Sequence, residues 1–242
     1  MKIFDPYIDE LRTLIDALSK GARHHTAHFA PERTWPKGRS GEIVLADDTA
    51  IELGHPQTES VAFLMWTDSL EKINDGEITI IGPDLNELER GRAPFGKVVL
   101  IGAEGFDEAN AYERWQQLNQ LRLSLNLSGH MLRAVPQQNR EWSRISKVSL
   151  DQGLSLEVIG NELLRAYKGL DFVTTAEVAF VTSTATDVQR LREPAAKVWR
   201  ITNAMNRILD ELEMDCGACD LSEVCDEIEG LRELHGKAAQ KS

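Results

Sequence analysis

Hydrophobic and polar positions recur along the chain with two periods, and each period predicts one kind of element. Near the start, apolar side chains stand three or four positions apart, at Ile8, Leu11, Leu14, Ile15 and Leu18. This spacing predicts an amphipathic helix over residues 7–20. We expect Asp5 to be its N-cap, Pro6 to occupy its first position and Gly21 to end it.

Short apolar or alternating runs bounded by Gly, Pro and Asn-Asp follow, and such runs are typical of strands. The predicted strands span residues 49–54, 60–66, 77–81, 97–101, 140–146 and 177–182. Longer helical patterns predict helices over residues 108–132, 156–168 and 187–212. Because these elements are interspersed without regular βαβ alternation, we predict an α+β fold, a mixed sheet with packed helices.

Three segments are expected within a chain of 242 residues, a length that suits one large domain with a small appendage. Residues 1–44 are predicted to form an N-terminal helix and a linker, the linker being rich in Pro, Gly and basic groups over 31–41. Residues 45–195 form the α+β domain. Residues 196–242 form a helical C-terminal segment that carries the cysteines.

The composition narrows the class of protein. The chain is 42% hydrophobic and 27% charged, as in soluble globular proteins. An apolar run of about 18 residues is absent, so we expect no transmembrane helix. The first residues lack a secretory signal pattern, which together with the cysteine usage suggests a cytoplasmic protein. The net charge of −12 argues against nucleic-acid or anionic-membrane partners, because both require a basic face.

The main candidate for chemistry is a stretch with a C-x2-C-x5-C spacing that holds the 3 cysteines of the chain, Cys216, Cys219 and Cys225. Thiolates are preferred ligands of zinc and of iron–sulfur clusters, so we predict a metal or cluster site. Such sites usually take four ligands. Candidates for the fourth are Asp215, Asp220, His235, a second copy of the chain, a partner protein or a non-protein ligand. A labile disulfide or three unrelated thiols are the alternatives.

Charge and histidine spacing bear on which metal is held. Residues 210–229 contain acidic but no basic side chains, and this field opposes an anionic cluster more than a zinc cation. Zinc is therefore the alternative metal. His24 and His28 are four positions apart, a spacing that suits a metal on one helix face. The alternative for that stretch is a polar connector after the first helix.

Four sequence blocks together resemble one known family. They are Ile51 to Phe63, Asp75 to Gly91, Trp142 to Lys147 and Gly153 to Gly160. In order and spacing they are similar, over residues 45–192, to the middle domain of acetyl-CoA synthase, the β-subunit of the carbon monoxide dehydrogenase/acetyl-CoA synthase complex. The resemblance implies the fold of that domain and a role in anaerobic one-carbon or acyl-CoA metabolism.

The resemblance also bears on the cysteines. In that family the next segment carries the A-cluster, a [4Fe–4S] cubane bridged to two nickel ions, and Cys216, Cys219 and Cys225 occupy the corresponding place. The family also needs a fourth cubane cysteine and a later Cys-Gly-Cys for the distal nickel, whereas this sequence has no cysteine after Cys225. The resemblance therefore implies a [4Fe–4S] relative without nickel, and we do not expect this chain alone to make acetyl-CoA.

A second implied site is a CoA pocket, because the family's middle domain binds CoA through arginines near a tryptophan. Trp142 matches that tryptophan, Arg144 follows in the same block, and Arg140 is close by. Arginine pairs with phosphate oxygens and an indole offers a face to adenine. The alternative is that Trp142 is a partly buried strand residue and Arg144 a surface charge.

Three functions follow as hypotheses. The first, which we favour, is a cluster-bearing subunit or accessory protein that binds carbon monoxide dehydrogenase, a corrinoid protein or another redox enzyme, with a homo-oligomer as a further partner option. The second is a CoA-dependent enzyme with an open cluster site. The third is a zinc-stapled protein-interaction module, in which the cysteines only hold the last helix in place.

Overall fold

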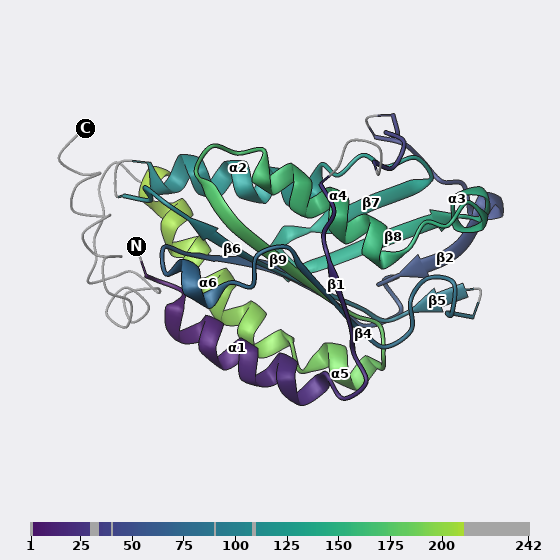
Figure 1. Cartoon of the computed structure of the whole chain (residues 1–242), viewed down its shortest axis with the longest axis horizontal. Helices are drawn as coiled ribbons and strands as arrows, with labels where there is room; N and C mark the ends of the chain where they lie inside the picture. The colour runs from purple at the N-terminus through teal and green to yellow at the C-terminus, as the bar shows by residue number, and fades with distance from the viewer. Residues whose placement is uncertain (1, 30–33, 40, 90, 108–109, 211–242) are drawn as a thin grey trace.

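Two β-sheets form the centre of the fold (Figure 1). The computed structural model describes residues 2–29, 34–39, 41–89, 91–107 and 110–210. The larger sheet has five strands in the order β1 (Arg23–Thr26), β4 (Glu77–Ile81), β9 (Val173–Val181), β6 (Phe95–Ala103) and β3 (Ser60–Thr67). The smaller sheet has four strands in the order β5 (Gly91–Ala93), β2 (Thr49–Leu53), β8 (Arg140–Ser146) and β7 (His130–Val135).

Helices cover both faces of the larger sheet (Figure 1). They are α1 (Asp5–Leu18), α2 (Ala111–Leu123), α4 (Leu156–Lys168), α5 (Ala185–Gln189) and α6 (Arg192–Asp210). The short helix α3 (Lys147–Asp151) instead contacts β2 and β8 of the smaller sheet. Figure 1 shows α2 and α4 on one side of β6 and β9, with α1, α5 and α6 on the other. Gly160 permits the close approach of α4 to β4, since a Cβ there would lie 2.9 Å from the Ile78 side chain.

Aromatic stacking marks the core at one end of the larger sheet. The fully buried Trp66 of β3 stacks on Phe106 at 5.2 Å and on Trp115 of α2 at 5.3 Å between ring centroids. Phe4 meets the same indole edge-on at 4.5 Å, so the start of α1 joins this cluster. Burying an aromatic side chain of this size stabilises the fold by about 2–3 kcal/mol, and stacked pairs add to that.

The prediction of an α+β fold is confirmed by the two mixed sheets and their helices. Three elements begin and end where the hydrophobic pattern placed them: β4, β8 and α4. Ser155 caps α4, because its side chain accepts a hydrogen bond from the amide of Val158. Within the described ranges, no helix is long and apolar enough to cross a bilayer.

Two predicted helices are wrong in extent. The helix expected over 108–132 ends at Leu123, and its last part is instead β7, which pairs with β8. Gly129, with φ of 71°, makes the turn that starts β7, so strand pairing replaces the apolar helical pattern there. The helix expected over 187–212 is divided into α5 and α6, with Thr184 as the N-cap of α5.

The N-terminal region differs from expectation in two details. Residues 23–26, expected as part of a polar connector, form β1, which pairs antiparallel with β4. Phe4 rather than Asp5 is the N-cap of α1, and the Asp5 carboxylate accepts hydrogen bonds from the Thr67 and Ser69 hydroxyls. The N-terminal helix and strand thus pack on the larger sheet. The boundaries at 44/45 and 195/196 stay predictions.

Candidate functional site

The outer surface of the smaller sheet gathers arginines around one tryptophan. Side chains alternate along β8, so Trp142 and Arg144 point outward while Glu141 and Ser143 are buried. Strand register places Arg133 of β7 opposite Trp142, and Glu52 of β2 opposite both Arg144 and Arg92. We call this set, Arg92, Arg133, Arg144, Trp142 and Glu52, the arginine face.

A single carboxylate holds two of these guanidiniums in place. Glu52 accepts from Arg144 Nε at 2.7 Å and from Arg92 Nε at 3.0 Å, and His55 Nε2 lies 3.8 Å from the same carboxylate. Burial opposes ionisation of Glu52, but the hydrogen bonds from Arg144 and Arg92 outweigh it and lower the pKa of Glu52 below its ordinary value. Glu52 therefore remains charged at neutral pH and fixes both arginines.

Trp142 is held between a cation and a histidine. The guanidinium carbon of Arg144 lies 4.7 Å from the Trp142 ring centroid, and the His55 ring meets the indole edge-on at 5.7 Å. The residue before His55 is Gly54, which has φ of 64° and packs closely against β8. A side chain at this position would not fit, because a Cβ there would lie 2.3 Å from the Glu141 carbonyl oxygen. The buried Trp142 Nε1 has no hydrogen-bond partner among the described residues.

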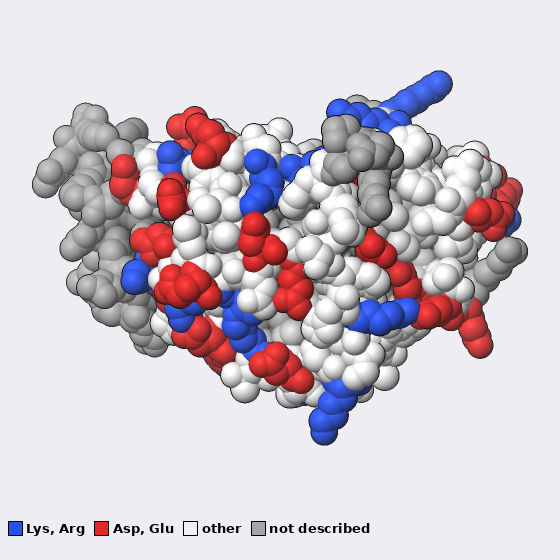
Figure 2. Space-filling view, viewed as in Figure 1, with Lys and Arg blue, Asp and Glu red and all other residues white. Residues whose placement is uncertain are grey.

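The charge of the arginine face suits an anion. The arginine face holds three guanidiniums and one carboxylate, and Arg144 keeps free N–H donors after binding Glu52 and the Val44 carbonyl. Such an excess of arginine contrasts with the net charge of −12 of the whole chain. Figure 2 shows acidic and basic side chains interspersed over one side of the molecule. Forked guanidiniums beside an indole can bind a phosphorylated ligand that carries a planar ring.

The structure does not describe the predicted metal ligands. Cys216, Cys219 and Cys225 lie outside the described residues, as do the candidate fourth ligands Asp215, Asp220 and His235. In the part of the chain that the structure describes, no group of three or more His, Cys, Asp or Glu side chains is placed to hold a metal ion.

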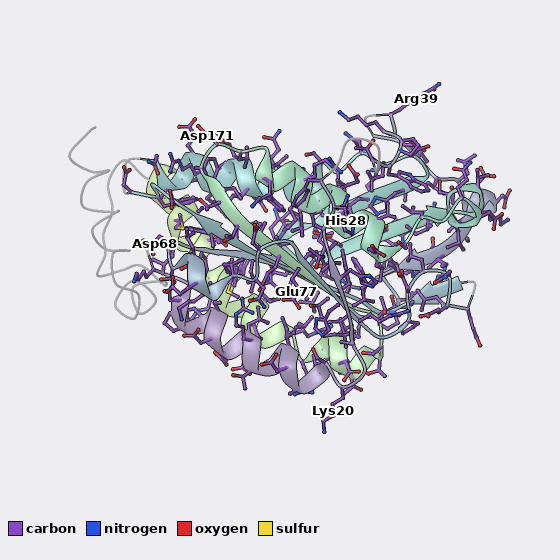
Figure 3. All side chains as sticks on the ribbon, in the orientation of Figure 1. Lys20, His28, Arg39, Asp68, Glu77 and Asp171 are labelled. Atoms are coloured by element: carbon purple, nitrogen blue, oxygen red, sulfur yellow. The ribbon has the colours of Figure 1, made fainter. Side chains whose placement is uncertain are left out.

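The two spaced histidines do not share a site. His24 is on β1, with Nδ1 2.7 Å from Glu77 Oε1, whereas the His28 amide donates to Asn161 Oδ1 of α4. Figure 3 labels His28 beside α4, apart from Glu77. The helical spacing that would have placed both imidazoles on one face does not exist, since His24 lies in the strand β1 and His28 follows it outside any helix.

Sequence reasoning missed a buried ionic cluster on the inner side of β8. Glu141 has a fully buried side chain, with Lys97 Nζ at 2.5 Å and Arg122 Nε at 3.4 Å from its oxygens. Burial lowers the pKa of Lys97, although the Glu141 charge raises it in part. The available signal was Lys97 itself, a charged residue within the otherwise apolar β6.

With this geometry described, comparison with known proteins defines the class. Residues 36–187 match the family model of the CO dehydrogenase/acetyl-CoA synthase complex beta subunit, and this chain belongs to that family. All five members of the arginine face lie within the matched residues. The resemblance inferred from the sequence blocks is therefore confirmed.

Individual relatives are distant. The acetyl-CoA decarbonylase/synthase complex subunit beta 2 of Methanosarcina thermophila is 26% identical over 181 residues, covering 72% of this chain and 36% of the relative. The subunit beta of the same complex from Archaeoglobus fulgidus is 27% identical over 191 residues, covering 72% and 33%. The chain thus matches about a third of the length of these relatives.

Proposed function

We propose that this chain is a CoA-binding subunit or accessory protein of one-carbon or acyl-CoA metabolism, with the arginine face as its CoA site. The observation that carries the proposal is the Trp142–Arg144 pair, 4.7 Å apart on a sheet surface with two further arginines. The names of the relatives, subunits of an acetyl-CoA decarbonylase/synthase complex, support this class of ligand.

The residues present fit CoA in two respects. The guanidiniums of Arg144, Arg92 and Arg133 offer forked donors for the phosphates, and Glu52 holds two of them in position before the ligand arrives. The Trp142 indole offers a planar surface for the adenine.

The proposal includes the cysteines as a metal site. Cys216, Cys219 and Cys225 would ligate a [4Fe–4S] cluster, which would supply electron transfer to or from a protein partner such as carbon monoxide dehydrogenase or a corrinoid protein. This part rests on the C-x2-C-x5-C spacing and on the family to which residues 36–187 belong. Zinc in the same thiolates would instead make the segment a structural staple.

The CoA part is tested by titration calorimetry with the purified chain. We expect saturable binding that Arg144→Ala weakens about 10- to 100-fold, because a charge-assisted hydrogen bond to phosphate contributes about 1.5–3 kcal/mol. Arg23→Ala is the matched control, since Arg23 forms a surface pair with Glu87 on another part of the fold. Absence of heat at millimolar CoA, or equal affinity in both variants, would reject the arginine face as the CoA site.

The metal part is tested by anaerobic metal analysis and an electronic absorption spectrum. Iron near four per chain, with absorption near 400 nm that bleaches on reduction and is lost in Cys219→Ser, would support a [4Fe–4S] cluster; these values are approximate marks of such clusters in general. Zinc near one per chain would support the structural staple. Protein free of both metals after reconstitution would reject a metal role for the cysteines.

A further inference from the structure

A cleft opens between α6 and the turn that joins β7 to β8. Its volume is about 270 Å³, and its lining includes Gln137, Gln138, Asn139, Arg140, Arg192 and Trp199. Neither Trp142 nor Arg144 lines it. The cleft therefore differs from the arginine face, although β8 contributes to both.

The walls of this cleft are held rigidly by one residue. Asn139 has a left-handed backbone with φ of 48°, the one non-glycine residue of this kind among the described residues. Its side-chain amide donates to the Ala195 carbonyl of α6 at 3.0 Å, and its own carbonyl accepts from the Ala62 amide of β3 at 2.6 Å. The turn, the helix and the sheet are thus fixed before any ligand binds, which favours affinity.

Two arginines line this cleft, and one of them pairs with the carboxylate of Glu59. Arg192 Nη2 donates to Glu59, which also accepts from Gln189 at 3.0 Å, and Arg140 Nη2 donates to the Thr58 carbonyl at 2.8 Å. Hydrogen bonds from Gln189 and Arg192, with the nearby charge of Arg140, lower the pKa of Glu59 below its ordinary value. Two cations and one anion leave a net positive charge, with free guanidinium donors on both arginines.

An aromatic ring completes the cleft. Trp199 of α6 is 37% exposed, so part of a large apolar side chain stays in contact with solvent beside the two arginines. Planar ligands stack on exposed indoles, and each such contact is worth about 1–3 kcal/mol for a nucleic-acid base. A net positive charge next to a free indole surface selects an anion that carries a planar ring.

We propose that this cleft binds a small aromatic phosphate, with the phosphate between Arg140 and Arg192 and the ring on Trp199. The Gln137 and Gln138 amides at the rim add donors for further polar groups of the ligand. The site is independent of the CoA proposal, because it uses another tryptophan and another pair of charges. Its small volume suits a ligand of this size rather than a full dinucleotide.

The test uses fluorine NMR of the full chain labelled with 5-fluorotryptophan, because the five tryptophans give separate probes. Trp199→Phe and Trp142→Phe assign the two relevant resonances. Phenyl phosphate is the probe, and we expect it to shift the Trp199 resonance saturably with a Kd of about 1 mM, reasonable for so small a ligand. Inorganic phosphate and phenol, each half of the probe, are expected to bind about tenfold more weakly or worse.

Arg192→Gln is the decisive variant, and we expect it to weaken phenyl phosphate about tenfold or more. Arg190→Gln is the matched control, since Arg190 is an exposed arginine nearby that does not line the cleft. A Trp199 resonance that does not move at 10 mM of the probe, or that moves equally in both variants, would overturn the proposal. Inorganic phosphate that binds as tightly as phenyl phosphate would overturn the role of the ring.

The same spectra separate this inference from the proposed function. CoA that shifts the Trp142 resonance, with phenyl phosphate leaving Trp199 unmoved, would retain the CoA site and reject the cleft. Phenyl phosphate that shifts Trp199, with CoA leaving Trp142 unmoved, would retain the cleft and reject the CoA site. Phenyl phosphate that shifts only Trp142 would assign the probe to the arginine face and reject the cleft.

Discussion

Each face of β8 has a glutamate between two cationic side chains, but one cluster meets solvent and the other is buried. On the outer face, Glu52 sits between Arg144 and Arg92 where the groups still meet solvent. On the inner face, Glu141 sits between Lys97 and Arg122 with side chains that are at most 6% exposed. The outer guanidiniums keep donors for a ligand, whereas the inner charges are enclosed by protein.

This difference in hydration decides what each cluster can do. Taking charges out of water is unfavourable, and the attraction between buried partners mainly offsets that loss. Removing one charged residue of the inner cluster therefore leaves its partners buried without a counter-charge, which destabilises the fold. The outer cluster, exposed on a sheet surface, is positioned to exchange water for phosphate oxygens.

The largest expected effect is on the inner face. Glu141→Gln should lower the free energy of unfolding by about 3–5 kcal/mol, because it leaves Lys97 and Arg122 buried without an anion. Glu52→Gln, the matched change on the outer face, should lower it by about 1–2 kcal/mol. Urea unfolding of both variants measures this, and equal losses would contradict the contrast between the two faces.

Acid should destabilise the protein through His130, which lies on the inner side of β7. Burial, with the charge of Lys97, lowers the pKa of His130 from 6.5 to about 4, so the folded state keeps it neutral. Between those values the unfolded chain binds more protons, and stability is lost as pH falls from about 6.5 toward 4. From pH 7 to pH 5 this contribution should fall by about 2 kcal/mol.

Urea unfolding at both pH values checks the effect of His130, with His130→Gln as the comparison. Carboxylates titrate in the parent protein and in the variant alike, so the informative quantity is the difference between the pH dependences of their stabilities. The variant should lose about 2 kcal/mol less than the parent protein between pH 7 and pH 5. Identical pH dependences would show that His130 titrates normally.

The outer face should separate binding from stability. Trp142→Ala should weaken CoA binding about tenfold or more, through loss of the stacking surface, while Trp142→Phe should retain part of the affinity. Calorimetric titration gives the affinities, and thermal unfolding shows whether each variant is folded. Loss of binding in both variants with lowered thermal stability would indicate a packing role for the ring rather than contact with the ligand.

The smallest expected effect on stability is that of Arg92, whose side chain is 47% exposed. Arg92→Ala should change the free energy of unfolding by less than about 1 kcal/mol, because solvent screens an exposed ion pair. The same variant should weaken CoA binding at low salt more than at high salt. Binding that responds to salt identically with and without Arg92 would remove this residue from the site.

Local pattern was sufficient where one element's periodicity is strong. The alternation of β8 and the apolar stripe of α4 placed both elements correctly, and the resemblance singled out Trp142 and Arg144. Pattern failed at residues 124–132, where apolar side chains continued at helical spacing past the turn at Gly129. It also failed for β1, a strand of four residues that exists because it pairs with β4.

The sequence by itself determined the fold class, the family and the two central residues of the candidate CoA site, because these depend on local periodicity and on residue order. Tertiary structure decided which charges meet. The pairing of Glu52 with Arg144 and Arg92, the enclosure of Glu141 by Lys97 and Arg122, and the meeting of Arg192 with Glu59 join residues 19 to 133 positions apart. Strand register and helix packing determine such contacts, and the spacing of residues along the chain predicts neither of them.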